Sequence, residues 1–343
     1  MRYSHRNQFD CRSDAKPLRW IIVRSLTTLA LTVTAWPLSG EAQDQGPLPL
    51  RNVHPAGLLH ISQHPEGAEV VADSEPRVGV LGSISNTMNR EKGVFLIDAE
   101  TRVVDFNAKI GVAPNLEVGA WLPLYYRGSG FTDQPIDEWH QTFGLPRGPR
   151  RRIPKDDYSF SGRNDDGTRF DLTETGTGLG NLELNAKYRF SDDQHEGGAA
   201  LMPSVGLPTA RSEFGAEQLD FGLTLFFDRR FGDTAVYSGV SCFHFLDESV
   251  GNLQQAPNVV QGFVGAAYSI SQRSSLYLGV DAASAMIVDA LEYPDYQLYL
   301  DFGGRIGITD RTQVVLGFRE NPTPSEGTTD ITFEVGLESQ FGS

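Results

Sequence analysis

Residues 181–190, NLELNAKYRF, alternate between polar and apolar side chains along their whole length. An alternation with a period of two predicts an antiparallel β-strand whose two faces meet different surroundings. The run is about as long as a tilted strand that crosses a bilayer, whereas strands of soluble proteins average about 5–6 residues. Its charges share one face, so the stretch predicts a transmembrane strand with Glu183, Lys187 and Arg189 turned away from lipid.

The same alternation recurs along the chain and predicts twelve strands. From the second strand onward, short connections alternate with longer ones, as in barrels with short periplasmic turns and long external loops. We therefore predict an all-β fold, a transmembrane antiparallel β-barrel of about 12 strands with one long external loop that carries a short helix. A soluble β-sandwich is the alternative, because its strands alternate in the same way. The predicted strands are 77–88, 94–112, 116–127, 179–190, 199–208, 217–230, 234–246, 258–270, 275–288, 295–308, 312–320 and 330–341.

The inward faces of these strands carry charges of both signs, which in a narrow barrel are expected to pair across the lumen. His244, beside Cys242, falls on the polar track of its strand and is interpreted as a lumen residue. Aromatic residues near the strand ends, Phe245 among them, suit girdles at the membrane interfaces. The candidate lumen charges are Lys109, Glu183, Lys187, Arg189, Asp301, Arg305, Arg319 and Glu334.

The N-terminal part divides into three predicted regions. Residues 1–42 combine basic residues, a short apolar stretch and small residues before Gln43, which is typical of a signal peptide. Residues 43–76 form an N-terminal extension that either plugs the barrel or stays in the periplasm, and residues 77–343 form the barrel. After residue 42 no run of 18 apolar residues occurs, so helical membrane spans are excluded. The formal net charge of −15 argues against nucleic acid as a partner.

Several motifs resemble known sites without meeting their patterns. Gly176, Gly178 and Gly180 have the spacing G-x-G-x-G and precede a strand, whereas a dinucleotide loop needs G-x-G-x-x-G before a helix. We interpret these glycines as the bend by which an external loop enters the wall. The stretch NDDGTRFD (164–171) departs from the calcium-loop pattern, and Pro65 disfavours a helix that would align His60 with His64. We thus predict no cofactor, no metal and no catalytic constellation, and the chain is not expected to be an enzyme.

The longest loop contains the predicted helix. Ile136, Trp139, His140 and Phe143 are spaced as one apolar stripe, Asp137 and Glu138 lie near the start, and Gly144 follows the end. The helix is expected either to dock on the barrel mouth or to act in gating or ligand contact. Arg147 and Arg150 to Arg152 follow it and could hold an anionic group such as a lipopolysaccharide phosphate.

Four stretches carry a family resemblance: GPLPLRNVHP (46–55), IDEWHQTFGLP (136–146), GTGLGNLELNAKY (176–188) and SVGLPTA (204–210). Together they resemble DUF3187, a family of uncharacterised proteobacterial outer-membrane proteins. The resemblance implies one barrel without an assigned substrate. Two positions depart from the family pattern, since Asn181 stands where Asp is usual and Ala210 where Gly is usual.

The function predicted is that of an outer-membrane channel or uptake protein for small molecules, in the cell outer membrane of a Gram-negative bacterium. Expected partners are outer-membrane lipid and lipopolysaccharide, the barrel-assembly machinery and a small-molecule substrate. Two alternatives remain open at this stage. One is an outer-membrane hydrolase at the barrel rim that uses His140 or His244 with a nearby carboxylate. The other is a structural or adhesion barrel whose long loop binds a partner.

Overall fold

The computed structural model describes residues 46–71, 74–144, 154–191, 197–250, 252–290, 293–322 and 327–342. All of them belong to one compact unit, Ser39–Ser343. The predicted signal peptide, 1–42, and the arginines at 147 and 150–152 lie outside the described residues.

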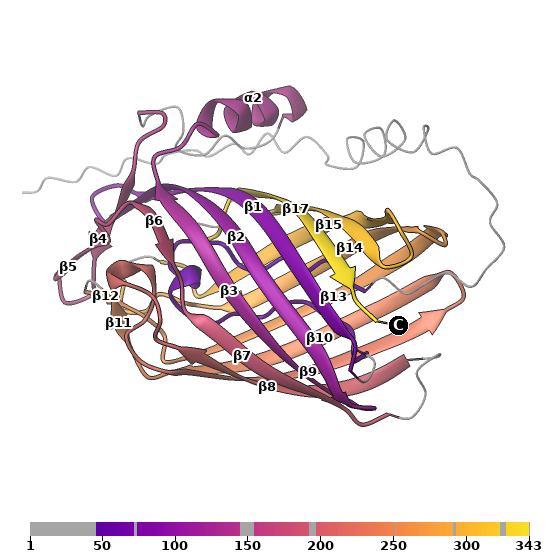
Figure 1. Ribbon diagram of the computed structural model, residues 1–343. Coiled ribbons are helices and arrows are strands. Elements are labelled where there is room, and N and C mark those ends of the chain that lie inside the picture. Colours follow the sequence, from indigo (N-terminus) through magenta and orange to yellow (C-terminus); the bar gives the residue numbers. More distant parts are fainter. Residues whose placement is uncertain are drawn as a thin grey trace, which may run out of the picture. The chain divides into compact units, whose positions relative to one another are not determined.

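Within the described residues, twelve strands close into an antiparallel barrel, as predicted (Figure 1). Each strand pairs with its neighbours in sequence, and the last pairs with the first, so that Val80 lies opposite Leu337. Closure removes the free edges that an open sheet would expose. The strands are β1 (Pro76–Glu91), β2 (Phe95–Ala113), β3 (Leu116–Gly128), β7 (Leu182–Arg189), β8 (Gly197–Leu207), β9 (Asp220–Phe231), β10 (Thr234–Phe245), β13 (Asn258–Ser271), β14 (Ser274–Ser284), β15 (Tyr296–Gly307), β16 (Thr312–Glu320) and β17 (Ile331–Gln340).

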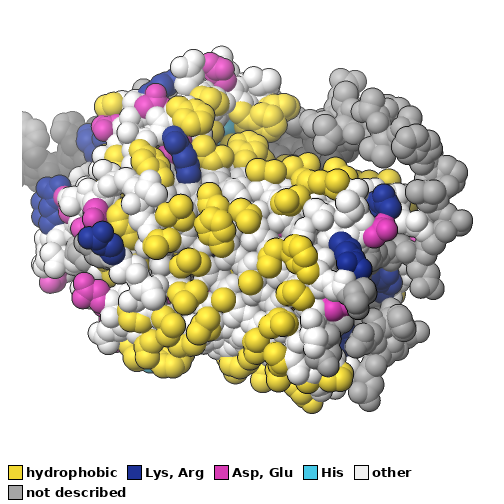
Figure 2. Space-filling model, in the orientation of Figure 1, with side chains coloured by type: hydrophobic (Ala, Val, Ile, Leu, Met, Phe, Trp, Pro, Cys, Tyr) yellow, Lys and Arg dark blue, Asp and Glu magenta, His cyan; other side chains and the backbone are white. Residues whose placement is uncertain are grey.

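The outer surface of the wall is apolar. In β17, Phe333, Val335 and Leu337 are exposed, while Thr332 and Glu334 on the opposite face are buried. Figure 2 shows hydrophobic side chains spread over the wall, with Lys, Arg, Asp and Glu gathered toward its two ends. An apolar belt on a closed barrel is the surface that a bilayer covers. In the part of the chain that the structure describes, no helix has the length and apolar character of a membrane span.

The predicted strand 179–190 differs in detail, because it is interrupted. A short strand, β6 (Gly176–Leu179), pairs with the end of β3, and β7 pairs with the start of β3. The glycines therefore lie in the wall rather than in the loop before it. A Cβ at Gly178 would stand 2.6 Å from the ring of Phe214, and one at Gly180 would stand 2.8 Å from Pro123. These glycines allow interior groups to approach the backbone closely.

The interruption is bridged by Asn181, one of the two positions that depart from the family pattern. Its side-chain amide donates to the carbonyl of Ala216 at 3.0 Å and accepts the N–H of Ala210, the other departure, at 3.0 Å. A carboxylate could accept but not donate, so an amide suits this position. The two unusual residues thus form one local contact.

Two predictions about residues of strand β10 are wrong. His244 and Cys242 are exposed on its outward face, so the interpretation of His244 as a lumen residue is wrong. Phe245, predicted for an interfacial girdle, is buried on the inward face, where its ring stacks on His60 at 3.9 Å. The physical reason is that the interior next to β10 is filled by apolar groups, including Ile61, which favours aromatic residues on the inward track.

The external loops carry the remaining elements: α2 (Asp133–Phe143), β4 (Ser159–Arg163), β5 (Arg169–Asp171), β11 (Ser249–Val250), β12 (Leu253–Gln254) and a 3-10 turn at Ser212–Phe214. Strand β4 extends the sheet beside the outer end of β2, and β5 pairs with β4. Phe95, Phe160, Phe170 and Leu253 from these loops and strand ends form a buried apolar cluster. The outer end of the barrel therefore has a hydrophobic core of its own.

A charge on the outward face tests whether lipid covers it. Val335, 58% exposed near the middle of β17, is suited to the change Val335→Arg. We expect a loss of about 2–4 kcal/mol in the free energy of unfolding, the cost of Arg near a bilayer midplane. The free energy of unfolding is measured by urea titration in liposomes, with the folded fraction read from heat-modifiable gel migration. Val335→Leu is the control, and equal stability of both variants would contradict the assignment.

Candidate functional site in the barrel lumen

Residues 46–71, called the lumenal segment below, run through the interior of the barrel (Figure 1). Most of them are buried although they form neither strand nor α-helix, and a single 3-10 turn occurs at Gly57–Leu59. The segment rises from the periplasmic end, turns near the external loops and descends again to β1. Irregular backbone at membrane depth needs hydrogen-bond partners from the surrounding protein.

The rising arm is held by three strands of the wall, β2, β15 and β16. Arg305 and Arg319 donate to the carbonyls of Pro47 (2.6 Å) and Leu50 (3.1 Å). The guanidinium of Arg51 forms an ion pair with Asp105 at 2.9 Å. The side chain of Asn52 donates to Gln297 at 2.6 Å. Side chains on the inward track of the barrel thus satisfy both the backbone and the side chains of this arm.

The turn of the segment enters the apolar cluster at the outer end. Ala56 and Leu59 pack in that cluster with Phe160. His54 is fully buried there; its Nδ1 accepts the N–H of Ala56 at 3.2 Å, and Nε2 lies 3.3 Å from the hydroxyl of Tyr293. Burial lowers the pKa of His54 from 6.5 to about 3. His54 is therefore neutral when the segment is in place.

The descending arm is bound mainly through its backbone N–H groups. Ile61 donates to Asp220 at 3.1 Å, Ala68 to Asp228 at 2.5 Å and Val71 to Glu117 at 2.6 Å. His60 also contacts Asp220, with 2.9 Å between Nδ1 and Oδ1. Hydrogen bonds to ionised acceptors are stronger than neutral ones. Carboxylates of the wall thus take the place of the neighbouring strand that this arm lacks.

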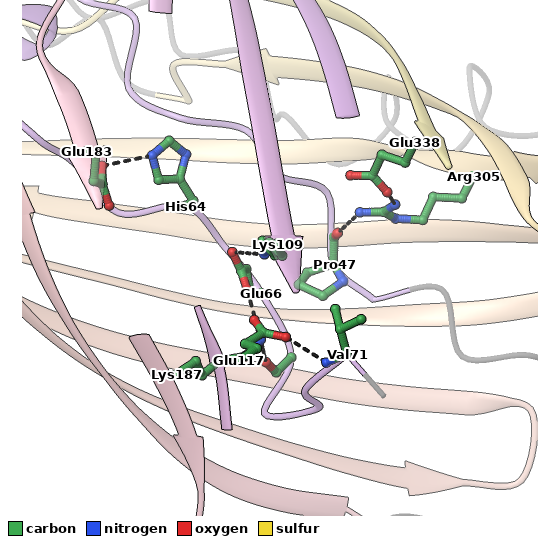
Figure 3. A network of polar contacts seen from close by, with 11 residues as sticks. Pro47, His64, Glu66, Val71, Lys109, Glu117, Glu183, Lys187, Arg305 and Glu338 are labelled. Atoms are coloured by element: carbon green, nitrogen blue, oxygen red, sulfur yellow. Dashed lines mark hydrogen bonds and ion pairs between the residues drawn. The ribbon is translucent and has the colours of Figure 1, made fainter. Parts of the chain in front are cut away.

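A cluster of charges lies around Glu66 in the descending arm (Figure 3). Its carboxylate contacts the ammonium groups of Lys109 and Lys187, the latter at 2.9 Å. Lys187 also pairs with Glu117 at 3.0 Å. Two residues earlier, His64 stacks on Trp121 with 3.9 Å between ring centroids and lies 3.3 Å from Glu183. Two lysines are therefore balanced by one carboxylate from the wall and one from the segment.

A second charge cluster lies on β14 to β17. Arg319 bonds both oxygens of Asp301, at 2.7 and 2.8 Å, and lies 3.6 Å from Asp281. Arg305 pairs with Glu338. Since these pairs form within the wall itself, they do not depend on the lumenal segment for charge balance.

The structure places the candidate lumen charges on inward faces. Lys109, Glu183 and Lys187 lie at the segment, and Asp301, Arg305 and Arg319 lie in the second cluster. Arg189 donates to the carbonyls of Ser191 and Gly197 at the periplasmic end. Glu334 is buried on β17, beside the second cluster. Sequence reasoning did not find the partners in the segment, Arg51, His60, His64 and Glu66. A signal was present, because 46–71 is rich in apolar residues and histidine yet lacks any strand or helix period.

The predicted helix is α2, which begins at Asp133 and ends before Gly144, whose φ of 70° is left-handed. It lies outside the barrel (Figure 1), and its exposed Trp139 has its ring 6.4 Å from that of the outward residue Phe318. Phe143 packs beside Trp139 and Glu138 is exposed, whereas Asp137 and His140 are buried beneath the helix. His140 lies 4.0 Å from Glu320. None of these five residues borders the lumenal segment in the contacts described.

A cavity of about 10 Å³ borders Arg51, His60, Trp121 and Glu183, which is about the room that one water needs. Among the described residues, no group of three or more His, Cys, Asp or Glu side chains is placed to hold a metal ion.

Comparison with known proteins identifies the family. A family model described as Protein of unknown function (DUF3187) matches residues 23–341. The chain belongs to this family. No curated protein matches the sequence of this DUF3187 protein.

Several solved structures are similar to this DUF3187 protein. The COG4313 outer membrane channel from Pseudomonas putida F1 is 10% identical and has a TM-score of 0.56, with 81% of this chain and 100% of that chain covered. The NanC porin is 6% identical with a TM-score of 0.45, covering 76% and 98%. The P. putida toluene transporter TodX is 11% identical with a TM-score of 0.37, covering 84% and 91%. Together with the apolar outer belt, the fold makes this DUF3187 chain an outer-membrane β-barrel of a Gram-negative bacterium.

The buried His54 predicts that acid weakens docking of the lumenal segment. Its pKa is lower in the docked state, so the released segment binds more protons, and lowering the pH below about 6.5 favours release. From the two pKa values, docking loses about 2 kcal/mol by pH 5. Hydrogen exchange of residues 46–71 against pH measures this. His54→Asn keeps an acceptor for the N–H of Ala56, and we expect it to remove the effect; the same pH response in both proteins would contradict the role of His54.

Proposed function

We propose that this protein is an outer-membrane channel for small molecules, closed by its own N-terminal segment. In this proposal residues 46–71 act as a plug, and transport occurs when the plug leaves the lumen. The observation that carries the proposal is the chemistry of the contact between segment and wall. Its descending arm is joined to the wall by hydrogen bonds and ion pairs, with carboxylates of Asp220, Asp228 and Glu117 as acceptors.

A polar contact of this kind can be replaced by water. Hydrogen bonds that break inside a protein are re-formed with solvent, so the net contribution of each bond to a charged group is only about 1.5–3 kcal/mol. After release, the inward track would present charged and amide side chains to water, as the interior of a porin does. The wall would therefore be suited both to holding the segment and to lining an aqueous path.

Other contacts keep the closed state favoured. Leu48, Leu50, Leu58 and Leu59 of the segment are almost completely buried, and full burial of such a side chain is worth about 1.5–3 kcal/mol. The segment is also joined covalently to the barrel, because the chain continues from it into β1. We propose that the plug is closed at rest and leaves the lumen as a minor state.

Disulfide locks test the plug directly. A Cβ at Gly317 would lie 3.3 Å from Cγ of Leu50, so Leu50→Cys with Gly317→Cys is suited to a disulfide between segment and wall. The background is Cys242→Ser, which removes the exposed native thiol. When the cysteine pair is reduced, we expect single-channel openings in planar bilayers. When the pair is oxidised, we expect the open probability to fall by about tenfold or more.

A second lock and a control make the result specific. Ile61→Cys with Gly206→Cys joins the descending arm to β8, where a Cβ at Gly206 would lie 2.6 Å from Cγ2 of Ile61. The single variant Leu50→Cys controls for the reducing agent. Equal conductance in the oxidised and reduced proteins would show that permeation does not require the segment to move. An absence of conductance in all reduced proteins would contradict a channel.

A further inference from the structure

The wall beneath Glu66 has the features of a binding site that the lumenal segment occupies. This site lies on three adjacent strands, β2, β3 and β7. In register, Lys109 lies beside Gly119 and Asn185, Trp121 lies between Asn107 and Glu183, and Glu117 lies opposite Lys187. We propose that this surface, called the lysine site below, binds aromatic carboxylates and that His64 and Glu66 of the segment occupy it in the closed state. The inference rests on the proposed channel function and names its class of substrate.

Charge balance is the first argument. With the segment docked, Lys109 and Lys187 face the carboxylates of Glu66 and Glu117. Without Glu66, Lys187 would keep its contact with Glu117, whereas Lys109 would lose the only ion pair that it forms among the described residues. An unbalanced charge of this kind is costly away from water. A ligand carboxylate between the two lysines would restore the balance that Glu66 provides.

Ring stacking is the second argument. The imidazole of His64 lies on the indole of Trp121 at 3.9 Å and an interplanar angle of 12°. The ammonium groups are close to aromatic faces as well, Lys109 at 5.9 Å from Trp121 and Lys187 at 5.9 Å from Phe226. The segment therefore places a planar ring and a carboxylate two residues apart on this surface. An aromatic carboxylate combines the same two groups in one small molecule.

Unused hydrogen-bonding groups on the same strands are the third argument. The indole N–H of Trp121, the side-chain amide nitrogen of Asn107 and both polar atoms of the Asn185 amide are buried and have no partner among the described residues. Buried polar groups are normally hydrogen-bonded, so a set of this kind next to two lysines calls for a partner. Oxygen atoms of a ligand would accept from the N–H groups of Trp121, Asn107 and Asn185, which the segment does not reach.

The lysine site also gives the plug a means of release. A ligand and the segment cannot occupy the site together, so a ligand carboxylate that binds Lys109 and Lys187 favours the released segment. The apparent affinity of the ligand for the full protein equals its affinity for the free site multiplied by the fraction of molecules in which the site is free. Weakening the segment's hold must therefore strengthen ligand binding.

Titration with benzoate tests the proposal. Fluorescence of Trp121 in the purified full chain reports binding once the three other indoles are removed by Trp20→Phe, Trp36→Phe and Trp139→Phe. We expect Glu66→Gln to tighten benzoate binding by about tenfold or more, because the competitor loses its charge. Glu69→Gln, a change of the exposed carboxylate three residues later, is the matched control and should leave the affinity unchanged. Lys109→Met should weaken binding at least tenfold, as should replacing benzoate by neutral benzamide or by acetate.

The outcomes separate this inference from the proposed function. Equal benzoate affinity in the unchanged protein, Glu66→Gln and Lys109→Met would overturn the lysine site, as would equal affinity for benzamide. If the reduced lock variants conduct while benzoate binds in none of these proteins, the channel stands and its substrate class is wrong. Benzoate binding that responds to Glu66 and Lys109 supports the site even if no conductance is seen.

Discussion

The hydrogen-bonding requirement of an extended chain inside a closed barrel explains much of the interior. The wall strands pair their backbone groups mainly with neighbouring strands, so the wall backbone offers few partners to a chain in the lumen. The descending arm of the lumenal segment depends on side chains instead, and the acceptors for Ile61, Ala68 and Val71 are all carboxylates. The acidic residues of the inward track are thus structural partners of the segment as well as potential lining for a water path.

The two ends of the lumen are closed by different physical means. At the outer end, Ala56 and Leu59 of the turn are packed with Phe160 and Phe170 in an apolar cluster. Toward the periplasmic end, Glu66 and the terminal carbonyls of the rising arm are held by charged groups. Apolar burial is little affected by salt or competing ions, whereas ion pairs respond to both. If the segment leaves the lumen as proposed, release starts most readily from the charged half, and the apolar turn determines how rarely the lumen opens.

The sequence was sufficient to predict the wall because each wall residue obeys a rule of period two imposed by lipid on one side. All twelve strands occur near their predicted positions, and the unbroken alternation at 181–190 matches β7. The rule failed where the interior is apolar. On β10 the inward track is aromatic, because it packs against Ile61 and His60, and His244 was placed on the wrong face. Polarity identifies the inward face only where that face meets water or charge.

The lysine site was only half visible in the sequence for a related reason. Lys187 was identifiable from its alternation, but its partner Glu66 lies 121 positions away in a segment without periodicity. Pairing of this kind depends on three-dimensional register, which no local pattern specifies. Once the register is known, the pairing has a thermodynamic consequence. If segment and ligand exclude one another at Lys109 and Lys187, each must weaken the binding of the other by the same free energy. A strongly docked plug and a weakly bound substrate are then two expressions of one equilibrium.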